Sequence, residues 1–215
     1  MQFGKLAGND HINARIYDFL DGLDPCDVPA FVRKFRSDSD EQCFHTYREL
    51  ILGAHLRSRG WNARYEQSIG GRKPDWIVLN EQNETTDIVD VVTLHQRRAT
   101  ELDISGSLSA HGLWTGWITI PPDHLYSKLH QKANAYVDLV ECARLPYLVA
   151  PFSEFTASID AQEIHHVLYE LHGGLFADAP MLSGLIFFRE RSGEYEFIEF
   201  PNLNATHPSA LVRDA

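Results

Sequence analysis

The stretch that decides the fold runs Gly71-Arg72-Lys73-Pro74-Asp75-Trp76-Ile77-Val78-Leu79. Its apolar end, residues 75–79, is typical of a strand. A polar loop follows, and residues 88–94 (Ile-Val-Asp-Val-Val-Thr-Leu) then form a β-branched, almost entirely apolar run. A run of this kind is typical of a central strand that is covered on both faces. Two strands near the middle of the chain are therefore the fixed points of the fold.

Helical and extended patterns alternate on both sides of these strands. Residues 41–59 carry apolar side chains at helical spacing, with Gly60 placed to end the helix. Residues 61–67 alternate in the manner of a strand. Further along we predict strands at 114–120 and 147–150, helices at 125–143 (with Asp123 as cap) and 161–172, and a hairpin of 185–189 with 195–200. This interleaving predicts an α/β protein in which a mixed central β-sheet is flanked by helices.

Composition narrows the class of protein. The chain has 215 residues, and 44% of them are hydrophobic, as in an ordinary globular protein. No apolar run is long enough to cross a bilayer, and the first ten residues lack the pattern of a secretory signal. Its three cysteines show no metal-ligand spacing. We therefore expect a cytoplasmic protein with reduced thiols and no membrane partner.

The charge is negative but unevenly distributed. The net charge of −11 argues against strong non-specific binding to a polyanion. Residues 1–100, however, hold 13 Lys and Arg against 15 Asp and Glu, whereas residues 101–215 hold 6 against 15. The basic residues near the two central strands are Arg57, Arg59, Arg64, Arg72, Lys73, Arg97 and Arg98. A local basic face on an acidic protein is compatible with this distribution.

Three acidic residues stand among apolar or aromatic neighbours. Glu49 lies inside the predicted helix 41–59, Asp75 opens a strand directly after Pro74, and Asp90 interrupts the most apolar strand. Burying a carboxylate is costly unless it is paired or binds a metal. Mg²⁺ prefers hard oxygen ligands and usually takes one or two carboxylates together with waters. Convergence of the three acids on a divalent cation would explain their positions.

This arrangement resembles the PD-(D/E)XK, or restriction-endonuclease-like, nuclease superfamily. The similarity rests on a helix with Glu49, the motif Gly71-Arg72-Lys73-Pro74-Asp75, and a strand with Asp90. It spans residues 41–150 as the nuclease-like core, with 1–40 as an N-terminal helical extension and 151–215 as a C-terminal helix and hairpin on the same domain. The resemblance implies Asp75 and Asp90 as ligands of Mg²⁺, with Mn²⁺ as the alternative, Glu49 as an auxiliary ligand, and DNA as partner.

The chain departs from the superfamily at its lysine. The resemblance places a lysine two residues after the second acid, where it helps to position the attacking water, but that position here is Val92. Some members carry the lysine on the following helix. Lys128 and Lys132 lie on the predicted helix 125–143, one turn apart, and either could serve.

Three functions remain open from sequence. The first is a metal-dependent nuclease that hydrolyses DNA phosphodiesters, with Glu49, Asp75, Asp90 and Lys128 or Lys132 as catalytic residues. The second is a catalytically inactive binding or interaction module, which Val92 and the acidic balance favour. The third is an unrelated α/β domain with structural acids. The pair His165-His166 lies within a predicted helix and has no third ligand at a recognisable spacing, whereas His95 follows the Asp90 strand and either faces the site or is a satisfied residue at the strand end.

Overall fold

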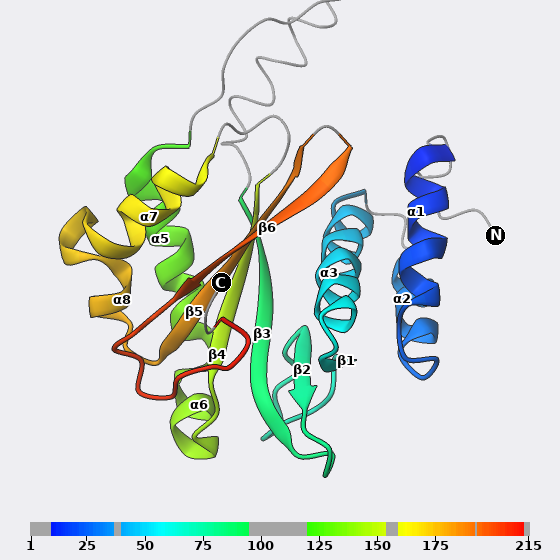
Figure 1. Ribbon diagram of the computed structural model, residues 1–215, viewed down its shortest axis with the longest axis horizontal. Coiled ribbons are helices and arrows are strands. Elements are labelled where there is room, and N and C mark those ends of the chain that lie inside the picture. The colour runs from blue at the N-terminus through cyan, green and yellow to red at the C-terminus, as the bar shows by residue number, and fades with distance from the viewer. Residues whose placement is uncertain (1–9, 37–39, 95–119, 154–158, 192, 213–215) are drawn as a thin grey trace, which may run out of the picture. The chain divides into compact units, whose positions relative to one another are not determined.

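The computed structural model describes residues 10–36, 40–94, 120–153, 159–191 and 193–212 (Figure 1). The strands within these ranges form a six-stranded sheet in the order β1-β2-β3-β4-β5-β6. Antiparallel pairs join β1 to β2, β2 to β3 and β5 to β6, whereas β4 and β5 run parallel. The sheet is mixed and helices flank it, so the prediction of an α/β fold is confirmed. None of the described helices is long and apolar enough to cross a membrane.

The chain divides into two compact units. The first comprises Met1–Val91 with Cys142–Leu145, and the second comprises Val92–Glu141 with Pro146–Ala215. The elements of the first unit are α1 (Asp10–Asp21), α2 (Val28–Lys34), α3 (Asp40–Ser58), β1 (Asn62–Tyr65), β2 (Trp76–Leu79) and most of β3 (Thr85–Leu94). The second holds α5 (Pro122–Ala133), η2 (Asn134–Tyr136), α6 (Val137–Ala143), β4 (Tyr147–Ser153), α7 (Ala161–Tyr169), η3 (Leu171–Gly173), α8 (Leu175–Asp178), β5 (Leu182–Arg191) and β6 (Glu194–Pro201).

The first unit packs α1 and α2 beside α3, and α3 beside β1. Apolar residues on α3 are fully buried, among them Leu50 and Leu52. An aromatic cluster of Phe31, Tyr65 and Trp76 joins α2, β1 and β2. The rings of Phe31 and Tyr65 stack with centroids 4.0 Å apart. This cluster fixes α2 against the start of the sheet.

A glycine brings α3 close to β2. The indole Nε1 of Trp76 donates to the backbone carbonyl of Glu49 at 2.9 Å. One turn further along α3, a Cβ added at Gly53 would lie 2.0 Å from Cζ2 of Trp76. Any side chain at this position would overlap the Trp76 ring, so the close approach requires glycine. This close contact and the hydrogen bond to the Glu49 carbonyl together fix the position of Glu49 on α3 relative to β2.

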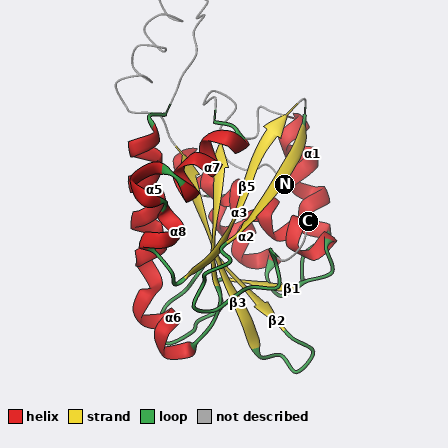
Figure 2. Cartoon of the chain, turned by 60° about the vertical axis from the view of Figure 1, so that its left-hand side comes forward, coloured by secondary structure: helices red, strands yellow, loops and turns green. Residues whose placement is uncertain are grey.

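The second unit pairs a three-stranded part of the sheet with helices. Figure 2 shows α5, α7 and α8 beside one another, and they contact one another directly. β4 is buried along its whole length, as expected for a strand between covered faces. The parallel pairing of β4 with β5 requires a crossover, and α7 lies in that connection.

Two predictions about the second unit need correction or lie outside what is described. The helix predicted for 125–143 begins earlier, at Pro122, and a turn of 3₁₀-helix at Asn134–Tyr136 interrupts it. Asp123 lies in its first turn rather than capping it, because Pro121 occupies the cap position. The strand predicted for 114–120 and the position of His95 lie outside the described residues, apart from Ile120.

Candidate metal centre

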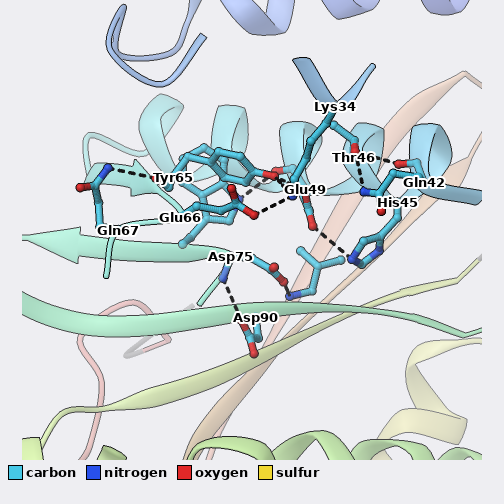
Figure 3. A network of polar contacts seen from close by, with 12 residues as sticks. Lys34, Gln42, His45, Thr46, Glu49, Tyr65, Glu66, Gln67, Asp75 and Asp90 are labelled. Atoms are coloured by element: carbon cyan, nitrogen blue, oxygen red, sulfur yellow. Dashed lines mark hydrogen bonds and ion pairs between the residues drawn. The ribbon is translucent and has the colours of Figure 1, made fainter. Parts of the chain in front are cut away.

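Glu49 is the buried centre of the site. It lies in the middle of α3 and is only 1% exposed. Its two carboxylate oxygens have different neighbours: Oε1 lies 3.1 Å from Nε2 of His45, and Oε2 lies 3.2 Å from the ammonium of Lys34. The hydroxyl of Tyr65 also donates to Oε2. Both oxygens of this buried carboxylate are therefore held in fixed directions (Figure 3).

Asp75 enters the site from the residue before β2. A tight turn with reciprocal 2.9 Å hydrogen bonds between Ile69 and Arg72 precedes it, and Pro74 leads directly into it. Oδ2 of Asp75 accepts the backbone N–H of Val91 at 2.8 Å. The Asp75 carboxylate is thus anchored to β3 through one oxygen.

His45, Glu49 and Asp75 form one group of potential metal ligands. Each offers one ligand atom, and these atoms lie within 4.8 Å of one another. His45 precedes Glu49 by four residues, so the two side chains leave the same face of α3. Two ligands on opposite sides of Mg²⁺ are about 4.2 Å apart, given Mg–O distances of about 2.1 Å. The group therefore needs only a small contraction to surround a divalent cation.

Lys34 supplies the positive charge beside Glu49. Its ammonium also contacts Oε1 of Glu66 at 2.8 Å and the hydroxyl of Tyr65 at 2.5 Å. With Glu49 this makes three acceptors, which is the number of N–H bonds an ammonium can donate. Glu66 reaches Lys34 from a left-handed backbone conformation, with φ at 46°. Lys34 therefore holds the Glu49 carboxylate in place, and Glu66 in turn holds the Lys34 ammonium.

These contacts shift the pKa values of Glu49, Lys34 and Tyr65. Burial alone would raise the pKa of Glu49, but the hydrogen bond from His45 and the charge of Lys34 hold that pKa below its ordinary value. Burial alone would lower the pKa of Lys34, yet the carboxylates of Glu49 and Glu66 hold it above the usual value. Burial, and then the Glu49 charge, raise the pKa of the Tyr65 phenol. Glu49 is consequently an ionised carboxylate at neutral pH, despite its burial.

No family model matches the chain, and no curated protein matches it. Among solved structures, the chain is similar to SfsA from Pyrococcus furiosus, solved in complex with Ca²⁺, with 12% sequence identity and a TM-score of 0.30. The similarity covers 75% of this chain and 64% of that chain. This chain thus spans less than two thirds of the length of the SfsA chain that it matches.

The structure places the three predicted acids differently. Glu49 and Asp75 come together, on α3 and at the start of β2. Asp90 lies across from Asp75 on β3, and its Oδ1 accepts the backbone N–H of Asp75 at 2.9 Å. In Figure 3 the Asp90 carboxylate points away from Glu49 and His45. Asp90 is not a member of the ligand group that the described residues form.

The two predicted lysines belong to the other unit. Lys128 and Lys132 lie on α5 in the second unit and are half-buried. The idea that one of them supplies the missing cation stays a prediction.

Two members of the site were missed by sequence reasoning. His45 could have been found, because a histidine four residues before a buried glutamate lies on the same helical face. Lys34 gave no such signal. It reaches Glu49 from another helix, and that contact depends on how α2 packs against α3.

Proposed function

We propose that this chain binds a divalent cation through His45, Glu49 and Asp75 and hydrolyses phosphodiester bonds in nucleic acid, with DNA as the first candidate substrate. The observation that carries the proposal is the group itself: a buried carboxylate, a second carboxylate and an imidazole within 4.8 Å. Carboxylates suit Mg²⁺ and Mn²⁺, and the imidazole suits Mn²⁺ better than Mg²⁺. Mn²⁺ is therefore the first ion to test, followed by Mg²⁺.

The chain's own residues have separate tasks in this proposal. A bound cation would supply Lewis-acid stabilisation of charge on the phosphate and would activate a water molecule. Lys34, through its contact with Oε2, keeps Glu49 ionised and oriented. Asp90 holds the peptide of Asp75 in place through its 2.9 Å hydrogen bond. We assign Asp90 to this positioning role rather than to direct ligation.

An inactive module is the second candidate function. The observation in its favour is Val92, which can neither donate a hydrogen bond nor carry a charge at the motif position. Under this alternative the chain keeps the fold and the cation site but cleaves nothing. Metal binding and cleavage therefore have to be measured separately.

The first test measures binding of the ion. An ion that binds only the folded state raises stability by about 2.7 kcal/mol at one hundred times its Kd. We expect Mn²⁺ to raise the Tm of the wild type and the gain to disappear in Asp75→Asn and in Glu49→Gln. Asparagine can still accept the Val91 N–H, so the fold should persist. The matched control is Glu81→Gln, which removes one exposed carboxylate from the same unit.

The second test measures cleavage. Labelled single-stranded and duplex DNA, and RNA of the same length, are incubated with Mn²⁺ or Mg²⁺ and resolved by size. The proposal expects cleavage by the wild type and by Glu81→Gln, and none by Asp75→Asn. A Tm gain that persists unchanged in Asp75→Asn would mean that the ion binds elsewhere. Ion binding at the group without cleavage of any substrate would leave the inactive module.

A further inference from the structure

A tight basic turn lies directly before Asp75, one of the three potential metal ligands, in the chain. Ile69 and Arg72 exchange two backbone hydrogen bonds of 2.9 Å across Gly70 and Gly71. Both glycines have positive φ, at 55° and 78°. Two central residues with positive φ are the requirement of a type I′ turn, which glycine meets without strain. The two backbone hydrogen bonds and the two glycines therefore account for the shape of the turn.

The tip of this turn is open. The four residues from Gly70 to Lys73 are exposed. Nothing lies within 4 Å of a Cβ added at Gly71. A ligand can therefore approach the backbone of the turn closely.

Arg72 differs from two arginines, Arg57 and Arg64, that support the first unit. Arg64 is paired with Asp27, and Arg57 donates to the carbonyl of Gly22. Within the described part of the chain, Arg72 forms no ion pair with a carboxylate. The guanidinium presents a planar fork of donors that matches phosphate oxygens. On a chain with a net charge of −11, the exposed guanidinium of Arg72, which forms no ion pair with the described residues, is accessible to an acidic ligand.

The distance from the turn to Asp75 fits a nucleic-acid strand. Three residues of extended chain span at most about 11 Å, so Arg72 lies within that distance of Asp75 along the backbone. One strand of duplex DNA advances about 3.4 Å per nucleotide. Allowing for the length of the arginine side chain, a phosphate held by Arg72 would lie within a few nucleotides of one at Asp75.

We propose that the turn at Ile69–Arg72, together with Lys73, grips the phosphate backbone of a nucleic acid and aligns a neighbouring phosphodiester with His45, Glu49 and Asp75. This inference rests on the proposed function and names the part of the chain that holds the substrate. Contacts to phosphate fix register but do not distinguish bases. Binding through the turn is therefore independent of sequence and falls as salt rises.

The test measures binding without metal. Fluorescence anisotropy follows labelled single-stranded DNA, duplex DNA and RNA of equal length, in EDTA and at several salt concentrations. Each phosphate contact contributes about 0.9 to the slope of log affinity against log salt for duplex DNA and about 0.7 for single strands. The double variant Arg72→Gln, Lys73→Gln should lose a slope of roughly 1.4 to 1.8. Its affinity at low salt should fall by about tenfold or more.

The control removes the same charge elsewhere. Arg59 and Arg144 are also exposed and belong to the same unit but lie outside the turn. The double variant Arg59→Gln, Arg144→Gln should keep the wild-type slope. Equal losses of slope in both double variants would overturn the proposal, because binding would then depend only on total charge. No loss of slope in the turn variant would also overturn it, because the turn would then not contact phosphate.

Two further measurements distinguish nucleic-acid binding by the turn from binding of an acidic protein and from damage to the metal site. Binding of polyglutamate is measured alongside binding of the oligonucleotides. If the turn variant loses polyglutamate binding but keeps oligonucleotide binding, the partner is an acidic protein and the proposal fails. The Mn²⁺-induced rise in Tm should be the same in the turn variant as in the wild type. Loss of oligonucleotide binding with an intact Mn²⁺ response supports the turn even if no cleavage is found. Loss of both would indicate general damage and count against it.

Discussion

Glu49 shows what a buried carboxylate needs in order to stay charged. An isolated ionised carboxylate in an apolar interior is unfavourable by many kcal/mol, and a partner alone seldom removes that cost. Here each oxygen has its own neighbours, His45 on one side and Lys34 with Tyr65 on the other. The stability of α3 does not require these contacts, since an apolar residue in place of Glu49 would need no polar partners. Glu49 is therefore compatible with the proposed cation site.

Gly53 gives the sharpest prediction at the level of one residue. We expect Gly53→Ala to destabilise the protein by about 3 kcal/mol, because overpacking a filled core commonly costs 1–3 kcal/mol and this Cβ would overlap the Trp76 ring. Alanine's advantage in a helix, about 1 kcal/mol, is too small to compensate. Urea unfolding measures the change. In a Trp76→Phe background the same substitution should cost clearly less, and an alanine that stabilises the wild type would contradict the contact.

His55 predicts a dependence of stability on pH. Burial, aided by the charge of Arg59, lowers the pKa of His55 from 6.5 to about 4. The unfolded chain therefore binds a proton at this residue before the folded chain does, so stability falls as the pH drops from about 6.5 to about 4. His55→Gln should flatten this part of the profile, by at most about 2 kcal/mol given its partial exposure. Thermal melts between pH 4 and pH 8 test this, and profiles of unchanged shape would refute it.

Among single residues, the sequence predicts the acids of the candidate site but not the side chains that contact them. Glu49 and Asp75 could be found because charged residues inside apolar patterns stand out. The orientation of Asp90 could not, because alternation along β3 gives the face on which a side chain lies but not the group with which it pairs. Lys34 depends on tertiary packing alone. Lys128 and Lys132 remain predictions for the same reason.

The helix α7 illustrates how an element is fixed at its end. Asp160 accepts the backbone N–H groups of Gln162 and Glu163, and the Glu163 side chain accepts the N–H of Asp160 in return. This reciprocal arrangement is a capping box. It sets the first residue of the helix after the segment that leads out of β4. The cap therefore contributes to the crossover between the parallel strands.

Removing this cap tests its contribution. Asp160→Ala should lower stability by about 1 kcal/mol, because two backbone donors lose their acceptor. For a chain of this size the Tm should fall by about 2–4 °C. Asp160→Ser retains a capping oxygen and should restore most of the loss. Equal melting temperatures for the alanine variant and the wild type would show that tertiary packing alone holds the helix end.

Most elements agree with their sequence patterns, and the exceptions have local causes. Helix α3 begins and ends within one residue of the prediction, since Gly60 adopts the positive φ of a helix terminator. The predicted helix 125–143 is divided at Asn134, whose side chain bonds the carbonyl of His130. Apolar spacing alone could not reveal that break, because the apolar residues continue at helical intervals across it. Polar side chains that bond the backbone decide such interruptions.

At the scale of the whole chain, the strand sequence was the most informative part of the prediction. The apolar run of β3 and the shorter run of β4 indicate covered strands, and the burial of most of β3 and all of β4 bears this out. Charge was informative in a different way. A net charge of −11 lowers the expectation for polyanion binding in general, so any such binding has to come from a local feature, such as the turn at Arg72.

The position of β6 has a consequence for how the protein behaves in concentrated solution. β6 is the last strand in the order of the sheet and pairs only with β5 among the described strands. Strands at such a margin can recruit a strand from another molecule and start aggregation. β6 carries Glu194, Glu196 and Glu199 among its eight residues. An incoming copy that paired through its own β6 would bring its glutamates alongside these, and that repulsion protects this margin of the sheet.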